Sequence, residues 1–321
     1  MIEYADLFAR CEKQFNFQIH AAEPIKLGWL NKKWILHTNK GKYVLKKYHN
    51  NRFKSVDTLR IALTQQHRLS QMMFPSPVLL EWEGEILHAD ESGERYILMQ
   101  YCEGSGIAPG MADRSHMYSL GRIIGQLHHH LNDGTLSGKS EPDFMPHAVE
   151  ARLAHWDDVI EQAVQMNKPH LVPIMELQKK MTQSLNLPAL QQACRQGWAH
   201  RDLWMDNLLF REETVSAVLD FDRLNFDYLD FDIARAILSG AFLEGQLDFG
   251  KTKAFLQGYQ ETAGFEVNYL SDIIRLLWYL ESKWWITAEM DNHHRIPARF
   301  AEEMIWIAEH HEQLDEMLMG M

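Results

Sequence analysis

Three polar residues flank two short apolar segments in the second half of this 321-residue chain. Asp202 and Asn207 precede the Leu-Leu-Phe segment at 208–210, and Asp220 directly follows the apolar segment 215–219. Asp and Asn favour turns, whereas short apolar runs are typical of buried strands. A hairpin of the two segments would therefore gather the three side chains on strand-anchored loops, where catalytic residues are often found.

These residue types suit the transfer of a phosphoryl group. Asn207 and Asp220 offer the hard oxygen ligands that Mg²⁺ prefers, while water and phosphates complete its coordination. Asp202 has only Arg201 as an opposite charge beside it in the sequence, so we expect it to orient a hydroxyl group and accept its proton. Phosphoryl transfer uses such a set together with a lysine that contacts the phosphates.

The lysine that the sequence offers is Lys46, at the end of the segment 43–46 (Tyr-Val-Leu-Lys). Side chains alternate between the two faces of a strand, so Val44 and Lys46 share one face and Lys47 points to the other. A small apolar side chain beside an ammonium group suits adenine and phosphate, respectively. We therefore expect Lys46, and not Lys47, to contact the nucleotide.

Several segments resemble kinase motifs. Residues 200–203 (His-Arg-Asp-Leu) followed by Asn207 resemble the catalytic loop, residues 43–46 resemble the lysine strand, and residues 220–222 (Asp-Phe-Asp) stand where protein kinases carry Asp-Phe-Gly. No Ala-Pro-Glu and no activation loop follow, which argues against the alternative of a protein kinase. The segments 27–31 (LGWLN), 120–128 (LGRIIGQLH) and 218–238 (VLDFDRLNFDYLDFDIARAIL) instead resemble the aminoglycoside phosphotransferase and choline kinase family, with the spore-coat-associated kinase-like group as the most similar branch.

The resemblance implies an α+β, protein-kinase-like two-lobe fold, with a small strand-rich N-terminal lobe over residues 1–103 and a larger helical C-terminal lobe over residues 104–321. It also implies an ATP- and Mg²⁺-dependent enzyme that transfers the γ-phosphate to a hydroxyl group of a small molecule. The resemblance implies that Asp202 is the catalytic base, that Asn207 and Asp220 are metal ligands, and that Asp232 braces the catalytic loop. It implies nucleotide contacts for Lys46, Met99, Gln100, Tyr101 and Cys102. We add Asn31 as a further nucleotide contact, His200 as a residue that hydrogen-bonds the loop backbone, and Asp222, Trp204 and Asp227 as candidates for substrate contact or assistance to the metal.

Two departures from the family pattern keep another alternative open. The expected phosphate loop, 27–31, contains one glycine, Gly28, where a close approach to phosphates usually requires more. The helix after Lys46 contains no Glu over residues 60–70, so Gln65 or Gln66 would have to hold the lysine. A catalytically weak or inactive kinase-like protein with a binding or structural role, for instance in a spore coat, would have these features.

The elements that must position these residues can be read from the apolar pattern. We expect a strand-rich first hundred residues, a glycine-rich hinge at 104–110 and a helical remainder. The expected strands form hairpins at 34–38 with 42–46, 79–82 with 85–88, and 207–210 with 215–220, and a further strand covers 95–101. The expected helices cover 1–20, 55–73, 115–131, 146–167, 171–184, 251–262, 268–290 and 297–317.

Composition narrows the class of protein and of partner. The net charge is -12, from 32 basic and 44 acidic residues, which argues against a nucleic-acid partner and is compatible with a cationic one. Cys11, Cys102 and Cys194 have neither disulfide nor zinc spacing, which is typical of a reducing compartment. The N-terminal segment is charged throughout, and no apolar run approaches the roughly 20 residues of a membrane span. We expect a cytosolic protein.

The acidic segment after Asp220 bears on the acceptor. Asp222, Asp227, Asp230 and Asp232 follow within a dozen residues. If some of these carboxylates line the open end of a cleft, they would attract an amine-bearing acceptor, and the indole of Trp204 could contact an alkylammonium group. The alternative is that they cap helices and pair with Arg223 and Arg235, which would leave a neutral pocket.

Overall fold

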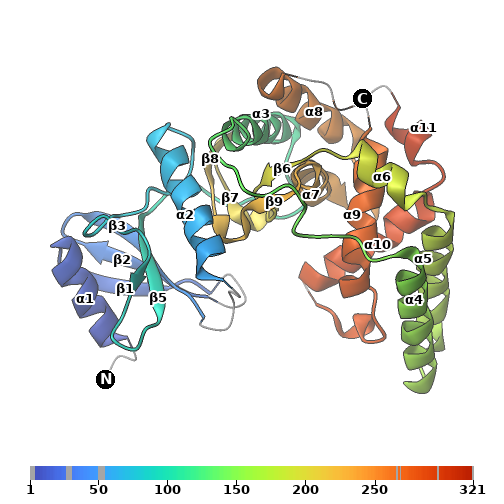
Figure 1. Cartoon of the computed structure of the whole chain (residues 1–321), viewed down its shortest axis with the longest axis horizontal. Helices are drawn as coiled ribbons and strands as arrows, with labels where there is room; N and C mark the ends of the chain where they lie inside the picture. Colours follow the sequence, from blue (N-terminus) through green and yellow to red (C-terminus); the bar gives the residue numbers. More distant parts are fainter. Residues whose placement is uncertain are drawn as a thin grey trace. The chain divides into compact units, whose positions relative to one another are not determined.

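The computed structural model describes residues 4–26, 31–49, 55–264, 267, 269–294 and 296–319. Residues 27–30, which include most of the expected phosphate loop, lie outside the described residues. The backbone divides into two compact units, shown in Figure 1: a first unit of residues 1–106 and 207–224, and a second unit of residues 107–206 and 225–321. The predicted lobe boundary at 103/104 stays a prediction.

The first unit is built on a five-stranded antiparallel sheet (Figure 1). Its strand order is β1-β2-β3-β5-β4. The bounds are β1 Ile19–Pro24, β2 Lys32–Thr38, β3 Gly41–Lys47, β4 His88–Ala89 and β5 Arg95–Gln100. In β3, Val44, Leu45 and Lys46 lie opposite Met99, Leu98 and Ile97 of β5. The strand predicted to carry the nucleotide lysine is therefore a central strand.

Two helices, α1 (Ala5–Phe15) and α2 (Val56–Gln71), pack on this sheet through separate apolar clusters. Leu7 of α1 packs in a cluster that includes Leu45 of β3. Leu59 of α2 packs in a second cluster, with Ile97 of β5. Because side chains alternate along β3, Leu45 faces α1 and Lys46 faces the side of Ile97 and α2.

A short hairpin, β7 (Leu208–Arg211) with β8 (Thr214–Val218), belongs to the first unit and has the predicted position. The backbone of Ser105 pairs with Phe210 through hydrogen bonds of 2.8 and 2.9 Å. Gly104 makes this approach possible, because a Cβ at its φ of +153° would lie 3.1 Å from the Phe210 carbonyl oxygen and closer still to the Ser216 hydroxyl. A single-turn 3-10 helix, η3 (Phe221–Arg223), follows β8.

The second unit is mainly helical, with two short two-stranded sheets. Its bounds are α3 Arg114–Leu131, α4 Val149–Gln165, η1 Pro169–Leu171, α5 Val172–Ser184, α6 Leu187–Ala193, β6 Gln196–Ala199, β9 Asn225–Tyr228, α7 Asp230–Ala241, β10 Phe242–Leu243, β11 Gln246–Leu247, α8 Phe249–Ala263, α9 Leu270–Trp285, η4 Met290–Asn292, α10 Ile296–His310 and α11 Leu314–Leu318. The 3-10 helix η2 (Met205–Asn207) leads from this unit into the hairpin.

Small residues let α3 and α8 approach closely. A Cβ on Gly121 of α3 would collide with the backbone of Phe255, and one on Gly258 of α8 would collide with that of Tyr118. The side chains of α7 from Ile233 to Ala241 are buried. This packing brings the polar groups of α3, α7 and α8 into one interior region, which the sequence pattern alone did not indicate.

Three differences from the predicted elements matter. The helix expected over 1–20 ends at Phe15, and β1 follows. The hairpin expected at 79–82 with 85–88 is confirmed at its turn, where Trp82 and Glu85 pair through two backbone hydrogen bonds of 3.0 Å. Its outer residues pair elsewhere, because Leu79 bridges Met99 and His88 pairs with Tyr96 of β5. The elements β6, β9, α6 and α7 were not predicted. In the part of the chain that the structure describes, no helix combines the length and apolar character needed to cross a bilayer.

Candidate active site

Lys46 lies in the interior of the first unit and makes two ion pairs. Its side chain is 3% exposed, and Nζ lies 2.6 Å from Asp220 Oδ1 and 2.5 Å from Asp222 Oδ2. Burial alone would lower the pKa of the ammonium group, but Asp220 and Asp222 together raise that pKa above its ordinary value. Lys47 instead pairs with Glu94 and lies over the ring of Tyr4. The predicted register of β3 is therefore correct.

Asp222 is the residue that holds Lys46 in place of a helix glutamate. Its carboxylate is buried and also accepts hydrogen bonds from Tyr48 Oη at 3.0 Å and from Asn31 Nδ2 at 3.2 Å. The expectation that Gln65 or Gln66 takes this role is wrong. Gln66 donates to the Pro77 carbonyl and Gln65 accepts from Arg68. The carboxylate of Asp222, two residues after Asp220, pairs with the ammonium group instead.

Asp220 and Asn207 lie at the same end of the β7–β8 hairpin. The Asn207 carbonyl oxygen accepts a hydrogen bond of 2.8 Å from the Leu219 amide, directly before Asp220. Asp220 has a left-handed backbone, with φ of 62°, which turns its side chain out of the strand direction. Burial alone would raise the pKa of its carboxyl group, but Lys46 and Lys33 lower that pKa well below its usual range.

The four predicted adenine contacts lie at the end of β5 and in the segment after it. Met99 and Gln100 are the last residues of β5, and Tyr101 and Cys102 follow. The amide of Gln100 donates to the Val78 carbonyl at 2.9 Å, and that of Tyr101 donates to the Lys42 carbonyl at 3.1 Å. These two amides are thus used within the protein. Asn31, the remaining predicted nucleotide contact, donates its side-chain amide to Asp222.

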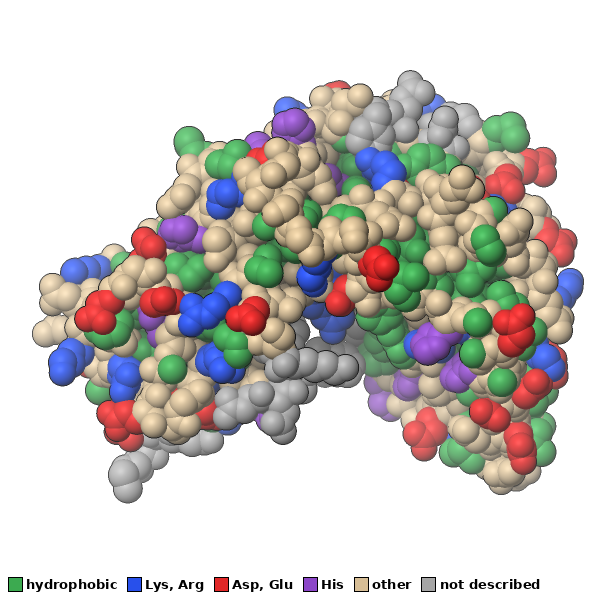
Figure 2. All heavy atoms as spheres, in the orientation of Figure 1, with side chains coloured by type: hydrophobic (Ala, Val, Ile, Leu, Met, Phe, Trp, Pro, Cys, Tyr) green, Lys and Arg blue, Asp and Glu red, His purple; other side chains and the backbone are tan. Residues whose placement is uncertain are grey.

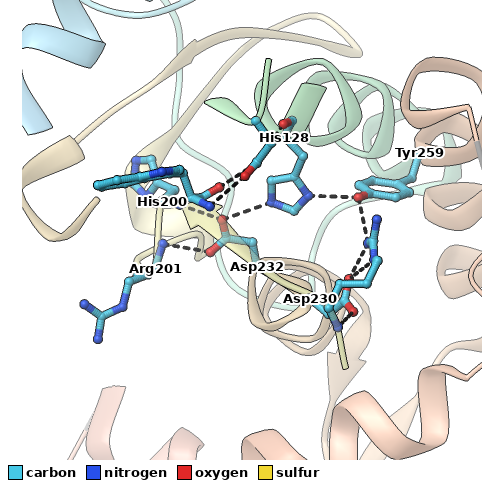
Figure 3. A network of polar contacts seen from close by, with 9 residues as sticks. His128, His200, Arg201, Asp230, Asp232 and Tyr259 are labelled. Carbon is cyan, nitrogen blue, oxygen red and sulfur yellow. Dashed lines mark hydrogen bonds and ion pairs between the residues drawn. The ribbon is translucent and has the colours of Figure 1, made fainter. Parts of the chain in front are cut away.

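The predicted catalytic loop is held by Asp232 of α7, as Figure 3 shows. One carboxylate oxygen accepts from the His200 amide at 2.7 Å, and the other accepts from the Arg201 amide at 2.8 Å. Arg201 has φ of 67°, a left-handed conformation that is costly for a residue with a side chain. The two hydrogen bonds fix this backbone conformation directly before Asp202, the predicted base.

The Asp232 carboxylate is also the first member of a longer polar network (Figure 3). His128 Nε2 lies 3.2 Å from Asp232 Oδ2, and His128 Nδ1 lies 2.8 Å from the hydroxyl oxygen of Tyr259. Arg195 donates to that Tyr259 oxygen at 3.1 Å and pairs with Asp230. Sequence reasoning missed His128 as a site residue. The sequence feature that could have identified it is its position in the segment 120–128, which resembles the family.

The aspartates after Asp220 do not form an exposed acidic cluster. Asp222, Asp227, Asp230 and Asp232 are all buried. The expectation that some of them line an open cleft is therefore wrong for these side chains. Burial without a cation would be costly, so each has found a partner inside its own unit. Their ion-pair partners include Lys46, Arg201, Arg195 and His128, in that order.

Asp227 illustrates how the partners act. Arg201 Nε lies 2.7 Å from Asp227 Oδ2, an ion pair whose angles are not those of a hydrogen bond, and the other arm of Arg201 reaches Asp143 at 2.9 Å. Burial raises the pKa of the Asp227 carboxyl group, and Arg201 only partly offsets this. Asp227 is therefore tied to Arg201, directly before Asp202, and its predicted role as a substrate contact stays a prediction.

Asp202 itself lies near the cation Arg235 in the second unit. Burial lowers the pKa of the Arg235 guanidinium, but Glu281, Glu303 and Asp202 raise that pKa above its ordinary value. Glu303 pairs with Arg235 at 2.6 Å and with Arg299 at 3.1 Å. Glu302 also acts on Arg299, so carboxylates outnumber guanidinium groups in this group.

Aromatic side chains lie beside this charged group. The ring of Trp204 lies 5.7 Å from that of Phe300, and Trp285 lies 4.6 Å from Phe300 on another side. The guanidinium carbon of Arg235 lies 4.7 Å from the centre of the Phe300 ring. Trp204, which was predicted as an acceptor contact, is thus part of a partly exposed aromatic group in the same unit as Asp202.

Comparisons with known proteins identify the family and the fold of this chain. The model of a phosphotransferase enzyme family matches residues 21–266. A search of curated protein sequences finds no match. Among solved structures, a microcompartment-associated aminopropanol kinase is similar, with 18% identity, a TM-score of 0.66, and coverage of 97% of this chain and 98% of that one.

Two further structures are similar at low identity. A spectinomycin phosphotransferase, solved with ADP and spectinomycin, has 11% identity and a TM-score of 0.62, with 97% of this chain and 98% of that chain covered. The choline kinase of Cryptosporidium parvum Iowa II has 13% identity and a TM-score of 0.56, with 97% and 95% covered. These matches confirm the predicted kinase-like α+β fold and the resemblance inferred from the sequence.

Proposed function

The chain belongs to the phosphotransferase enzyme family, and we propose that it transfers the γ-phosphate of ATP to a hydroxyl group of a small molecule. The observation that carries this proposal is the buried contact of Lys46 with Asp220, since phosphoryl transfer needs a fixed cation beside a metal-binding carboxylate. The solved relative with bound ADP is a phosphotransferase of the same fold. ATP is therefore the donor that we propose.

Asp202 is the proposed base of the reaction. The loop that carries it is fixed by the two hydrogen bonds to Asp232, so its carboxylate needs no reorganisation to orient the acceptor hydroxyl group. The carboxylate accepts the hydroxyl proton as the new oxygen–phosphorus bond forms, and the bond between the γ-phosphorus and the bridging oxygen of ADP breaks. Lys46 offsets negative charge on the phosphates.

A magnesium ion fits the donor set at the end of the hairpin. Asp220 offers a carboxylate that is ionised across the neutral range, and Asn207 offers an amide oxygen next to it in the fold. We propose that these two residues hold Mg²⁺, which would neutralise charge on the nucleotide phosphates when bound. Asp220 would then exchange part of its contact with Lys46 for the metal.

For the acceptor, we propose a small hydroxylated molecule that carries an amine. Carboxylates outnumber guanidinium groups around Asp202, and the Trp204 ring offers a face for an ammonium group. Two of the similar structures are kinases named for amine-bearing alcohols, choline and aminopropanol. The carboxylates of Asp222, Asp227, Asp230 and Asp232 are buried and paired, so they are not available to an amine.

A second candidate is a kinase-like protein that binds nucleotide but transfers phosphate slowly or not at all. Its role would be binding or structural, for instance as a component of a spore coat. The observation that favours it is that Lys46 is held by the metal-site aspartate itself and by Asp222, and not by a separate glutamate on α2. An intact Asp202, Asn207 and Asp220 favour the enzyme.

A screen of ATP consumption distinguishes the two candidates. Purified full-length protein with MgATP is incubated with aminoglycosides, choline-like amines, amino alcohols and neutral sugars, and ADP release is followed. The enzyme proposal expects saturable turnover with at least one hydroxylated amine, and none with the O-methylated form of the same compound. Binding of MgATP without acceptor-dependent ADP release across the panel would favour the second candidate.

A further inference from the structure

A group of basic side chains on α4 and α9 is not used by the proposed reaction. Arg152 and His155 lie on α4, Lys283 lies on α9, and His147 lies two residues before α4 begins. Lys283 Nζ lies 2.9 Å from His147 Nε2, and the hydroxyl group of Tyr279 on α9 donates to the His147 carbonyl at 2.7 Å. These contacts bind the two helices together and place four basic groups in one region.

Arg152 is the unusual member of this group. It is 2% exposed, yet neither of its terminal guanidinium nitrogens has a hydrogen-bond partner among the residues that the structure describes. A buried guanidinium normally directs its donors at a carboxylate or at backbone carbonyls, because leaving them without acceptors is costly. Nε2 of His155, one turn further along α4, is buried and has no hydrogen-bond partner among the described residues either.

The basic groups influence one another and lack a neutralising carboxylate. Burial lowers the pKa of Arg152 to about 10, so it stays charged at neutral pH. The charges of Lys283 and Arg152 lower the pKa of His147, and burial and then Arg152 lower that of Lys283. Within the described ranges, no salt bridge joins these side chains to an acidic residue, and Asp158 acts on His155 only at a distance.

The rings around Arg152 do not account for it. Its guanidinium carbon lies 4.7 Å from the centre of the Tyr279 ring and 6.0 Å from that of Trp156. Such contacts stabilise the cation through its face but leave the N–H donors in the plane without acceptors. His147 is exposed, and His155 and Lys283 are partly exposed, so solvent reaches this group of side chains. Figure 2 shows that histidine side chains are present on this face of the molecule.

We propose that Arg152, His155, Lys283 and His147 form a binding site for a small oxyanion, either a phosphate or a carboxylate group. The planar fork of an arginine matches two oxygens of either group, and Lys283 adds a point charge at the exposed side. The site lies entirely in the second unit and uses neither Lys46 nor Asp202. The proposal of an oxyanion site is therefore independent of the proposed phosphotransferase activity.

Calorimetric titration of the full chain tests the site. The probes are inorganic phosphate and acetate, with sodium chloride at matched ionic strength as the blank. The variants are Arg152→Met and Lys283→Ala, and the matched control is Lys180→Ala, an exposed lysine of α5 that pairs with Glu312. We expect saturable binding of phosphate, acetate or both, weakened at least about tenfold in both variants and unchanged in the control. The stronger probe identifies the oxyanion class.

A structural role of Arg152 gives a different result. If the ring contacts were its purpose, Arg152→Met would lower the midpoint of urea unfolding. The anion-site proposal expects an equal or higher midpoint, because a buried charge without a partner is removed. Should Arg152→Met not fold, Lys283→Ala alone decides, since Lys283 is partly exposed. Absence of saturable heat with both anions, or parental affinity in either variant, overturns the proposal.

Discussion

The carboxylate of Asp222 lies 2.5 Å from the ammonium group of Lys46, although 176 residues separate them in the chain. This contact gives the lysine a fixed negative partner two residues beyond Asp220, within the same short segment as the proposed metal ligand. A movement of α2 would therefore not release Lys46, whereas a change in η3 would. The position of the lysine depends on the segment after β8.

Asp222→Asn should impair the use of ATP. The amide keeps the shape but removes the charge that holds Lys46, and hydrogen bonds to charged groups contribute about 1.5–3 kcal/mol. We expect kcat/KM for ATP to fall roughly 10- to 150-fold, since about 1.4 kcal/mol corresponds to a factor of ten. Steady-state kinetics measure this, with Glu213→Gln in the exposed hairpin turn as the control. Parental kcat/KM in the variant would show that Asp220 alone holds the lysine.

The network behind the catalytic loop should control turnover and not nucleotide binding. Asp232→Asn replaces one of two acceptor oxygens by a donor that faces a backbone N–H, and His128→Gln removes the ring between Asp232 and Tyr259. We expect kcat to fall by at least about tenfold in each variant. The dissociation constant of MgATP, measured by calorimetry, should change less than twofold, or roughly within 0.4 kcal/mol.

His129→Gln is the matched control for this network, because the neighbouring His129 is outside the network on the same helix. It should keep parental kcat. If His128→Gln also keeps parental kcat, the histidine supports only the packing of α3 on α8, and the bracing of the loop rests on Asp232.

Arg201→Gly should destabilise the protein in spite of a favourable backbone effect. Glycine adopts the φ of 67° without the penalty of about 1–2 kcal/mol that a side chain incurs there. Asp227, however, would lose its ion-pair partner and stay buried, which costs about 3–5 kcal/mol. The loss of the ion pair outweighs the relief of the backbone, so the urea midpoint should fall. The double variant Arg201→Gly with Asp227→Asn should recover much of the lost urea midpoint. A midpoint of Arg201→Gly alone above that of the parent would show that relief of the backbone outweighs loss of the ion pair.

Acid should weaken the first unit through Asp220. The pKa of this carboxyl group is lowered in the folded state, so its stabilising effect is fully present above the unfolded value of about 4 and is lost as pH falls through the folded pKa. The urea midpoint of the parent should thus decrease below pH 4, and that of Asp220→Asn should decrease less. Asp206→Asn is the opposite case. Burial raises the pKa of the Asp206 carboxyl group, so ionisation of this group lowers the stability of the folded parent as pH rises. Equal acid slopes for the parent and Asp220→Asn would contradict the first expectation.

Features that depend on neighbours in the chain were predictable. The hairpin β7–β8 follows from two apolar runs and a polar turn, and the opposite orientations of Lys46 and Lys47 follow from strand alternation. Asn207 and Asp220 could therefore be placed at one end of a hairpin. Asp232 could be assigned to the catalytic loop only through the family resemblance, because its hydrogen bonds to residues 200 and 201 cross more than thirty positions.

Partners set by tertiary packing could not be predicted. Nothing local distinguishes Asp222, which holds Lys46, from Asp227, which pairs with Arg201. The strands β6 and β9 are four residues long and contain polar residues, so their pattern is too short to recognise. The orphaned guanidinium of Arg152 was also hidden, because its helix reads as an ordinary amphipathic segment and only packing shows which side chains are buried.

The most direct test of the proposed function is the turnover of Asp202→Asn. With MgATP and an acceptor identified by the screen, we expect kcat to fall by about 10²–10⁴-fold, because an amide can orient a hydroxyl group but cannot accept its proton. The thermal shift induced by MgATP, measured on the same samples, should equal that of the parent, which separates chemistry from binding. Phosphoryl transfer by Asp202→Asn at a rate near that of the parent would contradict the assignment of Asp202 as the catalytic base.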